Sequence, residues 1–231
     1  MSENEKLSVP AIIGAVVIVI VLGFFLAKSR VPKVQEQPTV AGAVATPSAP
    51  AEPTFDPASI PPVSDKDYVK GNTDAPVTII LYSDTQCPYC RAFYPILKGF
   101  LEQNSDIRFV YRPTPFHETG AVEEQAMDCA NDQGKYWEYF DAIYASTDKE
   151  NVTDPARLKK IATDNGLDGT VFEQCFSSKK YAGNTEIYLS AARVAGINGT
   201  PTSIIIGPNG TKKMEGAKSI EVLKSFVDSV K

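Results

Sequence analysis

The chain has 231 residues, a formal net charge of −5 and 43% hydrophobic residues. An acidic balance argues against nucleic-acid binding, so no nucleic-acid partner is expected. The length is sufficient for one domain with a buried core. Four cysteines are too few for a small disulfide-rich scaffold.

The N-terminal segment predicts a membrane anchor. Residues 1–6 form a short polar tail, and residues 7–27 carry no charge and are rich in Ile and Val. As a helix this stretch spans roughly 30 Å, the thickness of a bilayer core. A cleaved signal peptide has a shorter apolar region and a basic start. We therefore expect a single retained transmembrane helix.

The next segment, residues 28–64, is rich in proline and alanine. Such a composition offers little to bury and is typical of a semi-extended spacer. We expect a stalk here, followed by one globular domain over residues 65–231.

The domain reads in chain order as β-α-β, a helical block and β-β-α. A continuous apolar run at Val77–Tyr82 predicts a central strand. In the helical block, Thr119 is the expected cap of a helix whose first turn holds Glu123 or Glu124. The pattern predicts an α/β fold of the thioredoxin type with a helical insertion at about residues 116–196. The remaining expected elements are a helix from Pro88 to about Gln103, a strand at Ile107–Tyr111, an aromatic-rich stretch at residues 134–144 of the helical block, helices at residues 155–165, 169–177 and 181–195, a hairpin of Thr202–Ile206 with Thr211–Glu215, and a helix from Ser219 through Val230.

A Cys-x-x-Cys sequence, Cys87-Pro88-Tyr89-Cys90, lies where the first strand passes into the first helix. This spacing puts both sulfurs on one helix face, close enough to bridge. The free N–H groups at the helix N-terminus favour an anion, and thus the thiolate of Cys87. Pro88 suits the first helical turn. The arrangement indicates a reactive dithiol, against the alternatives of half a zinc site or an inert pair.

The two other cysteines, Cys129 and Cys175, both fall in the predicted helical insertion. We expect them to form a structural disulfide, the alternative being two buried free thiols. A zinc site built from all four cysteines would need more closely spaced ligand pairs, so no metal and no cofactor are expected.

Three further residues near these motifs have alternative interpretations. Asp84 is either a buried proton acceptor beneath the dithiol or, as we favour, a carboxylate that caps the loop. His117, the only histidine, is expected to have a helix-start or packing role. Trp137 and its neighbouring tyrosines are expected to fill the helical core, with a peptide-binding groove as the alternative.

The segment Ser83–Arg91 resembles the active-site segment of the DsbA-like thiol:disulfide oxidoreductases, in particular their membrane-anchored group. Gln133–Trp137 and Gly196–Thr202 resemble two further motifs of this family. The resemblance covers about residues 65–231. It implies that Cys87 and Cys90 are catalytic, that Pro201 is a cis-proline facing them, and that Thr200 binds an extended substrate.

The leading hypothesis is a membrane-tethered oxidase that introduces disulfides into exported proteins. The resemblance implies thiol-containing exported proteins as substrates, and a quinone-linked membrane reoxidase of the DsbB or vitamin K epoxide reductase type as partner. The same two cysteines could instead reduce or isomerise substrate disulfides, and the sequence does not fix the direction. A further alternative is a non-catalytic client-binding or metal-delivery module.

Two features of the sequence indicate opposite orientations for the anchor. Lys6 precedes the apolar segment, whereas Lys28, Arg30 and Lys33 follow it, and this count alone would place the domain in the cytoplasm. A structural disulfide and an oxidase-like dithiol instead suit an oxidising compartment. We expect a single-pass protein of the cell membrane with an extracytoplasmic catalytic domain.

Overall fold

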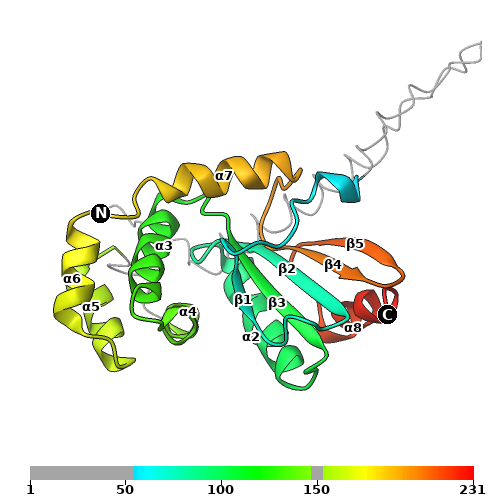
Figure 1. Ribbon diagram of the computed structural model, residues 1–231, viewed down its shortest axis with the longest axis horizontal. Coiled ribbons are helices and arrows are strands. Elements are labelled where there is room, and N and C mark those ends of the chain that lie inside the picture. The colour runs from blue at the N-terminus through cyan, green and yellow to red at the C-terminus, as the bar shows by residue number, and fades with distance from the viewer. Residues whose placement is uncertain (1–54, 147–152) are drawn as a thin grey trace, which may run out of the picture. The chain divides into compact units, whose positions relative to one another are not determined.

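The computed structural model describes residues 55–146 and 153–231 (Figure 1). The expected anchor at residues 7–27 and the stalk up to residue 54 lie outside the described residues. Within the described ranges, no helix is long and apolar enough to cross a membrane.

A five-stranded sheet in the order β1-β3-β2-β4-β5 organises the domain. The central strand β2 runs parallel to β3 and antiparallel to β4, so that Ile79 lies opposite both Phe109 and Ile205. All seven residues of β2 are buried, as its continuous apolar run predicted. The strands are β1 (Tyr68–Lys70), β2 (Val77–Ser83), β3 (Ile107–Pro113), β4 (Thr202–Gly207) and β5 (Gly210–Glu215).

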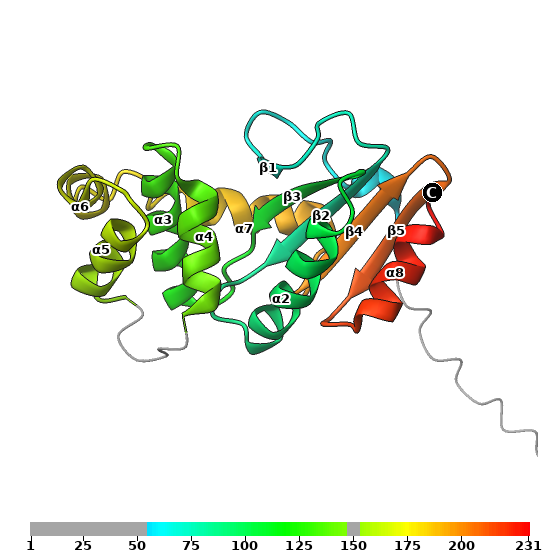
Figure 2. The same ribbon diagram turned by 90° about the horizontal axis from the view of Figure 1, so that it is seen from below.

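Alternate residues of β2 face two different cores. Ile79 and Leu81 belong to the larger core, whereas Ile80 and Tyr82 belong to a smaller one on the other face. Helices α2 and α8 cover the first face and α7 lies against the second (Figure 2). The helices are α2 (Pro88–Glu102), α3 (Glu118–Asn131), α4 (Tyr136–Ala145), α5 (Pro155–Asp164), α6 (Gly169–Ser177), α7 (Asn184–Val194) and α8 (Ile220–Asp228).

The helical insertion is present between β3 and β4, as expected, and comprises α3 to α7. Aromatic side chains of α4 fill its core: Tyr139 and Phe140 are completely buried, and Trp137 packs against the same cluster. Cys129 of α3 and Cys175 of α6 are joined by a disulfide with an S–S distance of 2.01 Å. The expected pairing is therefore present in the structure.

The N-terminal boundary of the domain differs from the sequence-based one. Residues 55–64, assigned to the stalk, include a short 3-10 helix, Pro57–Ser59, and pack against the sheet. Their apolar side chains Phe55, Ile60 and Val63 contact the smaller core. These three apolar side chains are spaced irregularly among prolines and give no periodic signal, so the sequence did not indicate this contact. The short edge strand β1 was also missed, because three residues are too few for a pattern.

Candidate functional site

Cys87 and Cys90 lie at the junction between β2 and α2, as the sequence predicted. Cys87 is the N-cap residue of α2 and Pro88 occupies the first helical turn. The backbone holds the junction closed, since Cys87 N donates to Asp84 O at 3.1 Å and Arg91 N donates to Cys87 O at 3.1 Å. Both cysteines are free thiols. Cys90 is 1% exposed and Cys87 is 6% exposed, so the first cysteine is the more accessible of the two.

The loop before β4 lies directly beside this dithiol. The Thr200–Pro201 peptide bond is cis, as the resemblance implied. Cys87 Sγ donates a hydrogen bond to Thr200 O at 3.4 Å. The loop is fixed from the other side, where Gly216 N donates to Pro201 O at 2.8 Å. Thr200 and Pro201 are therefore placed to contact anything that reaches the sulfur of Cys87.

The two thiols differ in their surroundings. Burial raises the pKa of the Cys90 thiol to about 12, although the Asp84 backbone and the Ser83 and Thr200 side chains oppose this rise by hydrogen bonding. Cys90 consequently stays protonated at neutral pH. In contrast, Tyr89 between the cysteines is 69% exposed. Both thiols are buried beneath the surface that Tyr89 reaches, and Cys87 is the less deeply buried of the two.

Asp84 caps the loop that leads into the dithiol. Its carboxylate is completely buried, accepts from Gln86 N at 2.9 Å and from His117 N at 3.0 Å, and lies 2.6 Å from His117 Nδ1. His117 is the N-cap residue of α3, which confirms a helix-start role and moves the cap from the expected Thr119. A Cβ on Gly120 would lie 2.3 Å from Asp84 Oδ1. Glycine is therefore required where the first turn of α3 meets this carboxylate.

Sequence reasoning missed a buried ionic cluster around Glu123. Its carboxylate, which has no exposed surface, lies 3.6 Å from Arg91 and 3.4 Å from Arg157. It also accepts from Gln86 Nε2 at 2.7 Å. Arg91 further donates to the backbone oxygen of Ser146 at 2.7 Å. The residue that follows the second cysteine thus fastens the active-site loop to α3 and to the end of α4. In the sequence, the only sign of this cluster was the charged residue Arg91 directly after the dithiol motif.

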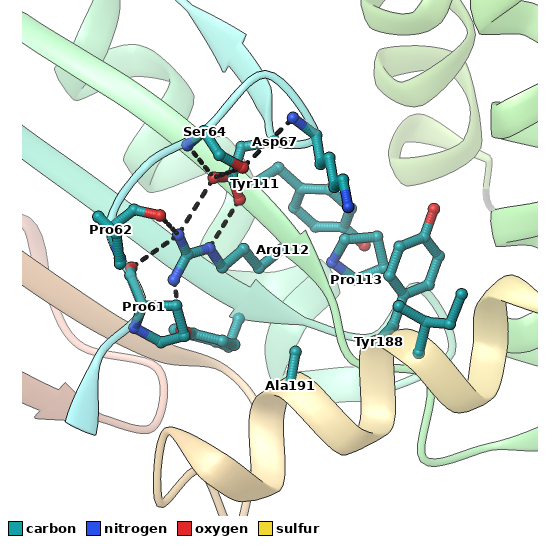
Figure 3. Close-up of a pocket in the computed structure, with 12 residues that line it drawn as sticks. Pro61, Pro62, Ser64, Asp67, Tyr111, Arg112, Pro113, Tyr188 and Ala191 are labelled. Atoms are coloured by element: carbon teal, nitrogen blue, oxygen red, sulfur yellow. Dashed lines mark hydrogen bonds and ion pairs between the residues drawn. The ribbon is translucent and has the colours of Figure 1, made fainter.

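A pocket of about 190 Å³ lies away from the dithiol, between residues 61–67, the end of β3 and α7 (Figure 3). Arg112 lines this pocket, and its guanidinium group already has hydrogen-bond partners within the protein. It pairs with Asp67 at 2.7 Å and donates to the backbone oxygens of Pro61 and Pro62. The same guanidinium donates to the Tyr82 hydroxyl. These contacts fasten the N-terminal segment to the sheet, so we do not regard this pocket as the active site.

Metal binding was one alternative for the cysteines. In residues 55–146 and 153–231, no cluster of three or more His, Cys, Asp and Glu side chains is arranged to hold a metal ion. Cys129 and Cys175 are bonded to each other, so neither sulfur can join Cys87 and Cys90 in one site.

A thioredoxin-type sheet with a Cys-x-x-Cys at the start of α2 and a cis-proline opposite defines the class of the protein. The sequence matches the family described as Thioredoxin over residues 64–229, and the chain belongs to this family.

Several solved structures share the fold. A thioredoxin-like oxidoreductase from Silicibacter pomeroyi DSS-3 superposes with a TM-score of 0.62 at 25% identity, covering 71% of this chain and 92% of that one. Wolbachia pipientis alpha-DsbA1 gives a TM-score of 0.64 at 22% identity, covering 77% and 96%. BdbD from Bacillus subtilis gives 0.61 at 18% identity, covering 69% and 90%. The expected DsbA-like architecture is therefore confirmed.

Among curated proteins, the matches carry a different name. The chain is 31% identical over 173 residues to the Na(+)/H(+) antiporter NhaA 3 of Salinispora tropica, covering 74% of this chain and 26% of the antiporter. It is 28% identical over 151 residues to NhaA of Herminiimonas arsenicoxydans, covering 64% and 24%. The chain spans about a quarter of the length of these relatives, so the antiporter name describes proteins with much more chain than is shared.

Proposed function

We propose that this protein is a thiol–disulfide oxidoreductase in which Cys87 exchanges disulfides with protein thiols and Cys90 is the buried partner with which it stores a disulfide. The observation that carries the proposal is the position of Cys87. Its sulfur lies at the N-terminus of α2 and 3.4 Å from Thr200 O, beside the loop that holds the cis-proline. A Cys-x-x-Cys pair at the start of a helix can store a disulfide between its two sulfurs.

The proposed exchange follows from this geometry. With Cys87 and Cys90 oxidised, a substrate thiolate attacks Cys87 Sγ, a mixed disulfide forms and Cys90 leaves as a thiolate. A second substrate thiol then attacks the substrate sulfur that is bonded to Cys87, and Cys87 leaves as a thiolate. Thr200 and Pro201 would hold the substrate backbone beside Cys87, in the way an exposed strand edge holds a peptide. The same steps run backwards would reduce a substrate disulfide.

We further propose that the physiological direction is oxidation, in a membrane-tethered protein whose domain is extracytoplasmic. Two observations support this: the uncharged segment at residues 7–27, and the second disulfide, which would persist in an oxidising compartment. Exported proteins with cysteines would be the substrates. A quinone-linked membrane protein of the DsbB or vitamin K epoxide reductase type would restore the Cys87–Cys90 disulfide.

The direction can be tested by equilibrating the purified full chain with glutathione and measuring the reduction potential of Cys87–Cys90. An oxidase should lie near the roughly −120 mV of DsbA, whereas a value near the roughly −270 mV of thioredoxin would favour the reductase alternative. Membrane tethering can be tested by fractionating cells that express the full chain, and by labelling cysteines in intact cells with a reagent that does not cross membranes.

The roles of the two cysteines can be tested by substitution. Cys87→Ser should abolish oxidation of a dithiol peptide, whereas Cys90→Ser should accumulate mixed disulfides through Cys87. The matched control is the double substitution of Cys129 and Cys175 by Ala, which removes two sulfurs elsewhere and should keep exchange activity. Faster alkylation of Cys90 than of Cys87 would contradict the assignment.

A further inference from the structure

The outer face of α7 exposes two large apolar side chains. Val194 is 66% exposed and Ile187 is 64% exposed, and among the large hydrophobic residues of the described part of the chain only Tyr89, between the cysteines, exceeds them. Seven positions make two turns of an α-helix, so Ile187 and Val194 lie on the same face. Ser190 and Ala191, which lie between them, are small and exposed. The result is an apolar stripe along α7 with no bulky group at its centre.

The opposite face of α7 already has its contacts within the domain. Ala192 is buried in the smaller core, and so is Ala195 directly after the helix. The stripe on the outer face is therefore not what holds α7 against the sheet, and its apolar side chains gain little from the fold of a single copy. Exposed apolar side chains that are gathered on one face, rather than scattered singly, mark interaction surfaces.

The stripe continues into the pocket beside α7. Ile187, Tyr188 and Ala191 line this pocket (Figure 3), and Pro61 and Pro62 of the N-terminal segment also line it. Its volume is about 190 Å³, and most of its lining surface is apolar. A surface that docks on the stripe therefore meets a recess for an apolar side chain at the Ile187 end.

Two opposite charges flank the stripe with the same spacing as its apolar side chains. Glu186 directly precedes Ile187, and Arg193 directly precedes Val194, so both charged side chains lie along one side of the stripe. Within one copy they pair at 3.1 Å, and both are largely exposed. The helix thus repeats a charged residue followed by an apolar one after seven positions, with opposite charges at the two ends.

We propose that the outer face of α7 is the interface of a symmetric dimer, in which the stripe of a second copy of this chain covers it. Two copies of α7 packed antiparallel about a two-fold axis near Ser190 place Ile187 of one copy against Val194 of the other. The same rotation brings Glu186 of one copy to Arg193 of the other, on one side of the stripe. The two-fold axis makes each of these contacts twice, and the small central residues let the helices approach closely.

The positions and signs of the charges select a second copy as the occupant. An isologous interface must be complementary to itself, and α7 meets this condition in its charges as well as in its apolar side chains. An exposed ion pair within one copy contributes little to stability, so the fold of a single copy does not require opposite charges at Glu186 and Arg193. One helix pair and its bordering pocket form a small interface, and we expect a dissociation constant in the micromolar range.

The first test is sedimentation equilibrium of the full chain in mild detergent over a range of concentrations, with Cys87 and Cys90 both alanine so that these thiols cannot join two copies. The protein should show a reversible monomer–dimer equilibrium. Ile187→Asp should abolish the dimer, because a carboxylate would be buried against an apolar side chain. The control is Val171→Asp, since Val171 is also an exposed apolar residue near the N-terminus of its helix. A monomer at every concentration, or a dimer that Ile187→Asp leaves intact, overturns the proposal.

The second test separates contacts between copies from the ion pair within one copy. In Glu186→Arg and in Arg193→Glu only like charges meet across the interface, so each variant alone should dimerise about 10-fold or more weakly. An equimolar mixture of the two should dimerise about as well as the unmodified protein, because the arginines of one variant meet the glutamates of the other. The pair within each copy stays broken in the mixture, so this rescue arises only between copies. A mixture that dimerises as weakly as the separate variants overturns the proposed interface.

Discussion

Opening the Cys129–Cys175 disulfide should lower the free energy of unfolding by about 4 kcal/mol. The two cysteines are separated by 46 positions, and the entropy lost by the unfolded chain on closing such a loop gives this value. In a domain of this size each kcal/mol shifts the melting temperature by about 2–4 °C. The midpoint should therefore fall by about 8–16 °C. The bridge fastens α6 to α3, a helix whose first turn also contacts Asp84 beside the dithiol.

The effect of the bridge can be separated from the effect of losing two side chains. In a background in which Cys87 and Cys90 are both alanine, urea unfolding of the oxidised and reduced forms compares the same polypeptide with and without the bond. The slope of the unfolding curve should rise on reduction, because the open chain exposes more surface when it unfolds. Free energies that agree within about 1 kcal/mol would refute the loop-entropy argument. Exchange of this bridge with dithiols at the rate of the Cys87–Cys90 pair would refute its structural role.

Three further perturbations test the surroundings of the dithiol. Gly120→Ala should lower the free energy of unfolding by about 1–3 kcal/mol, because the new Cβ overpacks against Asp84. The control is Gly99→Ala, whose Cβ would meet no atom within 4 Å beyond its own helix and which should be neutral or stabilising. Equal denaturation midpoints for the two variants would contradict this. Glu123→Gln should cost about 3 kcal/mol, because two partly buried cations lose their common partner, measured by the same unfolding curves. Burial raises the pKa of Glu124, so the folded protein keeps a proton that the unfolded chain loses above about pH 4.5. The free energy of unfolding should therefore fall as pH rises, and Glu124→Gln should flatten that fall. The same dependence of unfolding free energy on pH in Glu124→Gln and in the unmodified protein would show that Glu124 does not titrate in this way.

Patterns within short stretches of sequence predicted most of the fold. The apolar run of β2 indicated a buried central strand, and the helices expected at residues 155–165 and 169–177 are present as α5 and α6. The dithiol was predictable for the same reason. Its chemistry depends on a Cys-x-x-Cys sequence that follows a strand and begins a helix. These signals are local and are fixed by neighbours in the chain.

The acidic residues of α3 were not predictable in the same way. Glu123 or Glu124 was expected in the first turn of a helix, where a carboxylate normally faces solvent. In the structure both are buried, and the partners that satisfy Glu123 come from α2 and α5. Such contacts join residues more than 30 positions apart, and no spacing rule within one helix reports them. Tertiary placement decides whether a charged side chain is surface or core.

The position of the dithiol is set jointly by the thioredoxin-type core and by the helical insertion. β2 and α2 alone would determine where the backbone of Cys87 and Cys90 lies. However, the loop before Cys87 is held by Gln86, whose side chain donates to Glu123 of α3, and by Asp84, which accepts from His117 at the start of that helix. Any displacement of α3 must therefore move hydrogen-bond partners of the active-site loop. It follows that substitutions in the insertion can change thiol chemistry without touching either sulfur, and that the insertion belongs to the site as much as the strand and helix that carry the cysteines.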